Sequence, residues 1–277
     1  MAEGNDVDVV VAGAGFSGIY LVHSLRKAGF TFRVLESGGD VGGTWYWNRY
    51  PGARCDIPTT DYTYAWDPEL EHEWTWSEKY AAQPEILRYI NHVADRFDLR
   101  KDINFNTFME EARYDDQAAR WIIKAKDGRV WSAQYFVMCV GQLSTTKAPN
   151  YPGQSDFKGE IIHSGVWPKH EVDFAGKRVA IIGTGSSGMQ MTPIIAKEAK
   201  HLTVFQRTAN FSIPAANAPV TDEEDRAVKA SYRERRERAW NSATGLGFMP
   251  NKTSALDVSA EEREKAYEAA WNRLGFG

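Results

Sequence analysis

The sequence has only two cysteines, Cys55 and Cys139, and no Cys-x-x-Cys pair. Two thiols placed in this way form neither a disulfide framework nor a dithiol redox centre, which favours a reducing, cytoplasmic compartment. Long apolar runs are also missing, because the run at residues 7–14 is too short for a signal peptide or a membrane span. With 33 Lys and Arg against 37 Asp and Glu, a basic nucleic-acid footprint is not expected. No metal site is predicted.

The chain does contain one pattern that occurs twice. It consists of a strand, a glycine turn, a helix and a second strand. The first copy begins with the β-branched run at 7–14 and continues through a helical pattern at 17–28 and a strand at 30–37. Residues 176–208 repeat the same order of elements. This alternation predicts an α/β fold with two Rossmann-like dinucleotide-binding domains.

The segments between and after these copies predict the domain limits. We expect a helix at 84–97, an antiparallel insertion of short strands around Phe105, Trp121 and Val130, and a buried strand at 135–142. The tail from 221 to 277 carries charged helical patterns, one of which begins with a capping box of Ser259 and Glu262. The predicted organisation is a first domain at 1–145, a linker at 146–175, and a second domain with a helical insertion at 176–277.

The first glycine turn has the features of a dinucleotide site. Gly13, Gly15 and Gly18 form a GxGxxG pattern between strand and helix, where glycines permit the tight turn and the approach of a pyrophosphate. Glu36 stands at the end of the next strand, where a carboxylate accepts hydrogen bonds from the ribose hydroxyls and repels a 2′-phosphate. This site is predicted to take FAD or NAD rather than NADP.

The second turn has the same glycines but a different charge. Gly183, Gly185 and Gly188 repeat GxGxxG, the acid is absent, and Arg207 stands close to its place. A guanidinium there pairs with a 2′-phosphate, so this site is predicted to take NADP. Together the two sites suggest a flavin that is reduced by NADPH and passes its electrons to dioxygen.

The stretch between the two copies carries a family resemblance. The run "FKGEIIHSGVWP", residues 157–168, matches FxGxxxHxxxWP, and "GGTWYWNRYPGARCD" lies upstream of it. Together with "FQRT" these motifs resemble type I Baeyer–Villiger monooxygenases, closest to those acting on phenyl ketones, steroids or cycloalkanones. The resemblance covers essentially the whole chain. It implies an enzyme that uses FAD, NADPH and O2 to insert oxygen beside a ketone carbonyl through a C4a-peroxyflavin, giving an ester or lactone.

The resemblance also assigns residues to roles. It places Asp56 as the acid that orients a catalytic arginine, and we expect this carboxylate to be buried and ionised. The flavin's surroundings are assigned to Thr44, Trp45, Trp47, Asp56, Tyr62 and Gln142, and the NADP side to Arg54, Cys55 and Asp56. The remaining candidate cofactor contacts, beside the glycines, are Ser17, Tyr46, Met109, Thr184, Ser186, Ser187, Met189, Gln190 and Thr208. For His163 we favour a structural role over direct chemistry.

The family's arginine lies beyond residue 277, so the remainder of the enzyme is expected as a partner of this chain, along with a small-molecule ketone. Two alternatives stay open. One is a flavin monooxygenase that oxygenates nitrogen or sulfur, against which the Trp-Pro end of the fingerprint argues. The other is a non-catalytic, truncated dinucleotide-binding module.

Overall fold

The chain divides into two compact units, and each is described by itself. The first unit consists of Met1–Ala53 and Gln83–Gly176, and the second of Arg54–Ala82 and Lys177–Gly277. The structure, a computed structural model, describes residues 5–147, 149–210, 212, 214–246 and 252–273.

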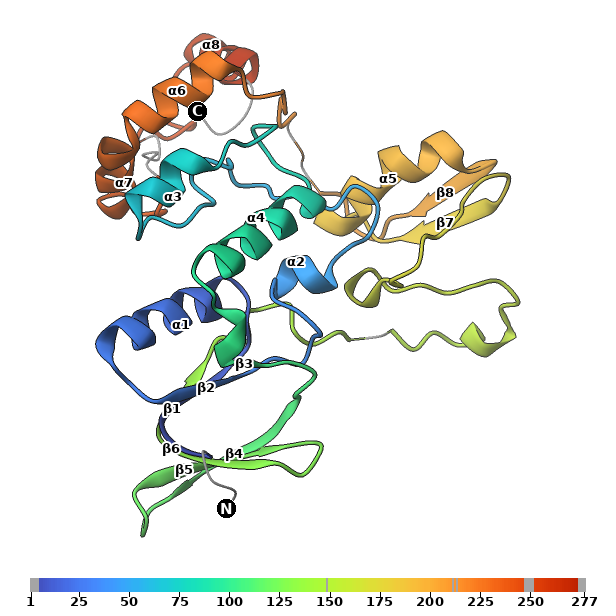
Figure 1. Cartoon of the computed structure of the whole chain (residues 1–277). Helices are drawn as coiled ribbons and strands as arrows, with labels where there is room; N and C mark the ends of the chain where they lie inside the picture. Colours follow the sequence, from blue (N-terminus) through green and yellow to red (C-terminus); the bar gives the residue numbers. More distant parts are fainter. Residues whose placement is uncertain (1–4, 148, 211, 213, 247–251, 274–277) are drawn as a thin grey trace. The chain divides into compact units, whose positions relative to one another are not determined.

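A six-stranded sheet is the centre of the first unit (Figure 1). Its strand order is β3-β2-β1-β6-β5-β4, in which β3, β2, β1 and β6 run parallel and β5 and β4 are antiparallel to their neighbours. The strands are β1 Asp6–Ala12, β2 Phe32–Leu35, β3 Ile103–Asn104, β4 Met109–Asp115, β5 Arg120–Ala125 and β6 Val130–Met138. The β-branched run of the sequence thus becomes β1, whose Val10 and Val11 are fully buried between β2 and β6.

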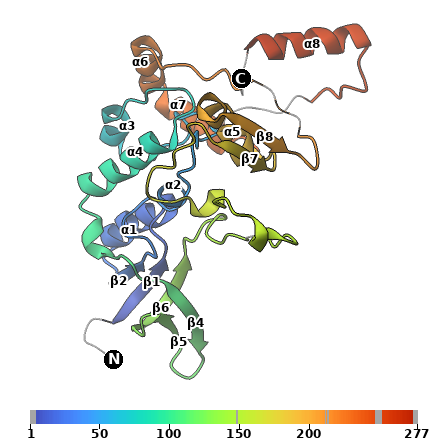
Figure 2. The same ribbon diagram turned by 90° about the vertical axis from the view of Figure 1, so that its right-hand side faces the viewer.

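Helix α1, Phe16–Ala28, lies along this sheet in both views (Figures 1 and 2). Its buried residues Ile19, Val22 and Leu25 recur at helical spacing, so one face of the helix packs on the core. The helix ends at Gly29, whose left-handed φ of 77° allows its N–H to bond back to the last turn. The unit's other helices are α2 Thr44–Trp47, α4 Gln83–Arg96 and the 3-10 turns η1 Arg100–Asp102, η2 Gln154–Asp156 and η3 Ser164–Val166.

Two sequence-based expectations for this sheet need correction. The piece near Phe105 is β3, which pairs parallel with β2 and is not part of an antiparallel insertion. The pieces at Val130 and 135–142 are one strand, β6, because its backbone pairs with β5 near its start and with β1 along most of its length. Its second half is not buried, since Tyr135 and Met138 are 50 % and 67 % exposed.

The second unit contains the repeated strand–turn–helix–strand pattern. Strands β7 Arg178–Ile182 and β8 His201–Phe205 pair parallel, and α5 Ser186–Glu198 connects them. Figures 1 and 2 show α5 beside this strand pair. Among the described residues no third strand joins the pair.

Helices α6 Asp222–Ala230 and α7 Tyr232–Trp240 belong to the same unit and contact its 54–82 segment, which contains α3 Pro68–Glu73. Arg236 on α7 forms an ion pair with Glu71 on α3 at 3.1 Å. The last helix is α8, Ala260–Arg273, and the predicted capping box at its start is confirmed, because Ser259 and Glu262 bond reciprocally at 3.0 and 3.2 Å.

The close approach of backbone inside the second glycine turn generates a testable prediction. A Cβ built on Gly188 would lie 2.2 Å from the carbonyl oxygen of Gly183, whereas a Cβ on Gly185 would meet nothing within 4 Å. We expect Gly188→Ala to lower the free energy of unfolding by about 2 kcal/mol, because the helix must move off the strand, and Gly185→Ala to change it by less than ~0.5 kcal/mol. Denaturant unfolding followed by circular dichroism measures both. Equal midpoints for the two variants would contradict this packing.

Candidate dinucleotide-binding sites

The predicted residues of the first site gather at one edge of the six-stranded sheet. Strands β2, β1 and β6 run parallel, so their carboxyl ends share an edge. Glu36 follows β2, Gly13 follows β1, and Gln142 lies just beyond the end of β6. The chain leaves β1 toward β2 on one side while β6 lies on the other, so the strand order reverses at this point. Parallel α/β sheets bind their ligands at such a switch point.

The glycine turn after β1 is shaped by backbone contacts that exclude side chains. Gly13 has a φ of 100°, and a Cβ there would lie 2.5 Å from the carbonyl oxygen of Cys139. A Cβ on Gly18 would lie 2.0 Å from the oxygen of Gly13. Gly15 faces Gly43, since a Cβ on either would come within 3.3 Å of the other's Cα. The start of the aromatic stretch therefore lies directly against the turn, a contact that sequence reasoning missed.

Glu36 is fixed by this turn. Glu36 is only 3 % exposed. Its two carboxylate oxygens accept hydrogen bonds from the backbone N–H of Ala14 at 2.7 Å and of Gly38 at 2.6 Å. Oε1 also accepts a hydrogen bond from the hydroxyl of Ser37 at 3.3 Å, so the remaining capacity for a further hydrogen bond is on Oε2. The chain thus holds an acceptor beside the glycine turn whose position does not depend on a ligand.

The helices that follow the two glycine turns begin without caps. Neither α1 nor α5 has a side-chain cap or an acid in its first turn. By contrast, α3 is capped by Asp67 and α6 by a capping box of Thr221 and Glu224. Uncapped N-terminal N–H groups and the positive end of the helix dipole suit a phosphate. The glycine cradles and the open helix starts fit a dinucleotide in both units.

In the second unit, Gln206 occupies the place that Glu36 has in the first. Gln206 directly follows β8 and lies as far along the chain from Gly183 as Glu36 lies from Gly13. Its Nε2 donates to Thr184 Oγ1 in the turn at 3.0 Å. Arg207 is the next residue and is exposed. Sequence reasoning missed Gln206, although counting from the first glycine would have found it. The other predicted residues of this site lie in the turn, on α5 or just after β8; they are Thr184, Gly185, Ser186, Ser187, Met189, Gln190 and Thr208.

The aromatic stretch forms a short helix, α2, in the first unit. Trp45 is buried and its carbonyl oxygen accepts a hydrogen bond from Gln83, while Trp47 is 37 % exposed. The hydroxyl of Tyr46 accepts hydrogen bonds from Lys169 Nζ and from the N–H of Gly39, both at 3.1 Å. The hydrogen bond from Lys169 holds the pKa of Tyr46 below its usual range.

The residues from Arg54 to Ala82 belong to the second unit. Arg54 exchanges two backbone hydrogen bonds with the side-chain amide of Gln190 on α5, at 3.3 and 3.1 Å, and its guanidinium pairs with Glu78 at 3.1 Å. Cys55 is buried, and burial raises the pKa of its thiol to about 11. Asp56, expected to be buried, is exposed and forms no ion pair with another described residue.

Three further candidates have local explanations. Met109 opens β4 and packs, partly buried, against a cluster around Val10 and Trp131. Gln142 is exposed beyond β6. His163 caps η3, because its Nδ1 accepts a hydrogen bond from the N–H of Gly165 at 3.1 Å, which agrees with a structural role for it.

No described helix is long and apolar enough to cross a membrane. No group of three or more potential ligand side chains among those residues could hold a metal ion.

The hydrogen bonds of Glu36 predict the effect of a near-isosteric change. In Glu36→Gln one oxygen is replaced by an NH2 group, which cannot accept from Ala14 or Gly38, and a buried N–H is left unpaired. We expect the free energy of unfolding to fall by about 1–3 kcal/mol. Denaturant unfolding checks this, with Glu111→Gln as control because Glu111 is exposed on β4. Superimposable curves for the two variants would show that the turn does not depend on the carboxylate.

The lowered pKa of Tyr46 is also measurable. Titration of tyrosinate absorbance should show one tyrosine that ionises below the value of about 10 for a free phenol. Tyr46→Phe should remove this early step, and Lys169→Met should move it to higher pH, because the hydrogen bond that favours the phenolate is lost. Lys158→Met, an exposed lysine of the same unit, is the control. The contact is refuted if Lys169→Met leaves the titration unchanged.

Comparisons with known proteins agree with this geometry. A family model described as flavin-binding monooxygenase-like matches residues 6–216. A Baeyer-Villiger monooxygenase of Pseudooceanicola batsensis is 45% identical over 98% of this chain and 50% of that protein. A phenazine N-monooxygenase of Lysobacter antibioticus is 42% identical, again over 98% and 50%. The structure of an oxidized steroid monooxygenase bound to NADP superposes with a TM-score of 0.92 at 51% identity, covering 98% of this chain and 52% of that one.

The chain spans about half the length of the curated relatives it matches. The likeness to these structures confirms the predicted α/β class with Rossmann-like units. With two unlike glycine-turn sites and relatives at this level of identity, the chain belongs to the flavin-binding monooxygenase-like family.

Proposed function

We propose that the protein to which this chain belongs is an FAD- and NADPH-dependent Baeyer–Villiger monooxygenase. Such an enzyme inserts one atom of O2 beside a ketone carbonyl to give an ester or lactone. The other oxygen atom leaves as water, and NADPH supplies the two electrons. The observation that carries the proposal is the pair of glycine turns with unlike side chains at their strand ends, Glu36 in one and Gln206 with Arg207 in the other.

The first turn would hold FAD. The open N-terminus of α1 provides N–H donors for the pyrophosphate, and Gly15 permits its close approach. The carboxylate of Glu36 is in place to accept hydrogen bonds from ribose hydroxyls. The flavin, once reduced by NADPH, supplies the activation of O2. We assign Thr44, Trp45, Trp47, Tyr62 and Gln142 to its surroundings as part of this proposal.

The second turn would hold NADPH. The start of α5 is open in the same way. Gln206 carries no charge that would repel a 2′-phosphate, and Arg207 beside it is exposed and forms no ion pair with another described residue. A guanidinium with free donors is well suited to a phosphate. The names of the relatives support this choice, since the steroid monooxygenase structure contains NADP.

Asp56 is proposed as a positioning residue for a cationic group near the reacting ketone. Its carboxylate is exposed and unpaired among the described residues, so that group would come from elsewhere in the protein. The relatives are about twice as long as this chain, which leaves room for it.

The remaining partner proposals are a small ketone and O2. The domain limits at 145 and 175 and a cytoplasmic location stay predictions.

Oxygenation of nitrogen is the second candidate, because a phenazine N-monooxygenase is 42% identical over nearly the whole chain. The two functions share both cofactors and differ in the product. Incubation with NADPH, O2 and either a cyclic ketone or a phenazine separates them. A lactone formed in preference to an N-oxide supports the Baeyer–Villiger proposal, and the reverse preference overturns it. Intact protein that is colourless and does not take up added FAD overturns both.

The choice of nicotinamide gives a residue-level prediction. We expect Arg207→Gln to raise KM for NADPH about tenfold or more and to leave KM for NADH nearly unchanged, because only NADPH carries the 2′-phosphate. Steady-state oxidation of both cofactors measures this. Arg178→Gln is the matched control, since Arg178 is also exposed but begins β7, at the opposite end of the parallel strand pair. An unchanged preference in Arg207→Gln would refute the assignment of this arginine.

A further inference from the structure

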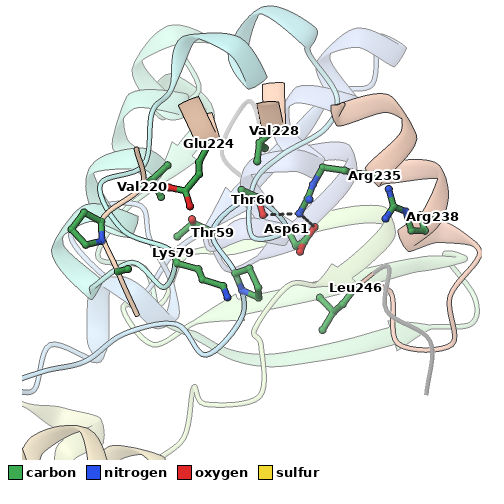
Figure 3. A pocket seen from close by; sticks show the side chains of 13 residues that line it. Thr59, Thr60, Asp61, Lys79, Val220, Glu224, Val228, Arg235, Arg238 and Leu246 are labelled. Carbon is green, nitrogen blue, oxygen red and sulfur yellow. Dashed lines mark hydrogen bonds and ion pairs between the residues drawn. The ribbon is translucent and has the colours of Figure 1, made fainter. Parts of the chain in front are cut away.

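The second unit contains a cavity that none of the candidate cofactor residues lines. Its volume is about 430 Å³, within the size range of small-ligand pockets. Figure 3 shows that its side chains come from two stretches of the chain, residues 58–79 and residues 218–246. Charged residues Lys79, Arg235 and Arg238 and apolar residues Val220, Val228 and Leu246 are among those that line it.

The walls of this cavity are held by hydrogen bonds between the two stretches. The N–H of Lys79 donates to the carbonyl oxygen of Ala218, and the N–H of Val220 donates to Ser77, both at 3.0 Å. The ammonium of Lys229 on α6 donates to the hydroxyl of Thr75 at 2.9 Å. These hydrogen bonds hold the two stretches together, so the cavity is part of the folded unit rather than a gap between independent segments.

The acids that line the cavity are already engaged. Glu224 closes the capping box of α6, because its carboxylate accepts from the N–H and hydroxyl of Thr221 at 2.8 and 2.9 Å. Asp61 lies 3.5 Å from the guanidinium of Arg235, which also donates to the hydroxyl of Thr60 at 2.9 Å (Figure 3).

The cations are not fully engaged. The Nε of Arg235 is buried and has no hydrogen-bond partner among the described residues. Lys79, whose ammonium lies over the ring of Tyr80 at 5.5 Å, and the exposed Arg238 form no ion pair with any described residue. The pKa of Glu224 is lowered by its hydrogen bonds from Thr221 and, to a smaller extent, by the charge of Lys79. The buried unpaired donor is unfavourable, and the two cations without an ion pair are free to bind an anion.

We propose that this cavity binds a small organic anion, a singly charged carboxylate on a short apolar body. Three cations and two carboxylates line the cavity, which leaves one positive charge to be balanced. The ammonium of Lys79 and the guanidinium of Arg238 would bind the carboxylate, and Val220, Val228 and Leu246 would contact the apolar part. This site does not depend on the proposed monooxygenase function.

The test is calorimetric titration of the intact purified protein with hexanoate, hexanol, hexylamine and hexyl phosphate. These probes share one chain and differ in the charge of the head group. We expect hexanoate to bind, hexanol and hexylamine to bind at least about tenfold more weakly, and hexyl phosphate to bind no more tightly than hexanoate.

Variants locate the binding. Lys79→Gln and Arg238→Gln should each weaken the binding of hexanoate about tenfold, because each removes one charged donor. Val228→Phe should weaken the binding of all probes, because it reduces the volume of the cavity. Arg233→Gln is the matched control on the same helix as Arg238, since Arg233 is exposed, pairs with Glu237 and does not line the cavity.

Each other outcome counts against the proposal. No binding of hexanoate, or equal binding of hexanol, would overturn the anion site. Tighter binding of hexyl phosphate would overturn the choice of a carboxylate. Unchanged affinity in both Lys79→Gln and Arg238→Gln, with circular dichroism spectra like that of the parent, would show that hexanoate binds elsewhere.

Discussion

Both candidate sites depend on one steric constraint, the contact between the third and first glycines of each turn. A Cβ on Gly18 or Gly188 would lie 2.0 or 2.2 Å from the carbonyl oxygen of Gly13 or Gly183. Only glycine permits the helix to begin this close to the end of the preceding strand. The first N–H groups of α1 and α5 are then directed at the edge of the sheet, where no side chain caps them. The shape of the candidate phosphate site at each turn therefore follows from this backbone contact and does not depend on a ligand.

The same constraint has different support in the two units. In the first, β1 is paired on both sides, and Gly13 meets the end of the neighbouring strand at Cys139. In the second, β7 is paired only with β8 among the described residues, a Cβ on Gly183 would meet nothing, and Ile182 is 66 % exposed. The second turn therefore relies on the contact within itself, and a change at Gly188 has fewer neighbouring contacts to compensate for it.

The sequence predicted the repeated units and both glycine turns because their signals are local. Glycine spacing, β-branched runs and a capping box each act over a few residues. It did not predict that Val130 and Tyr135 belong to one strand, because that depends on pairing with β1, more than a hundred residues away. It also missed Gln206, Gly43 and Lys169. The contacts of Gly43 and Lys169 with the turn and with Tyr46 join segments far apart in the chain, and no local pattern records them.

The two turns share their glycine contacts and uncapped helix starts, and the proposed difference in ligand preference comes from the side chains at one strand end. Glu36 is buried and bonded to the turn, so solvent screens its charge little, and it can oppose a 2′-phosphate strongly. Gln206 keeps a bond to the second turn without a charge, and the positive charge is moved to exposed Arg207. An exposed charge is screened by salt, whereas a buried one is screened much less. The discrimination of the first site against a 2′-phosphate should therefore depend little on ionic strength. The preference of the second site for NADPH over NADH should weaken as salt is added.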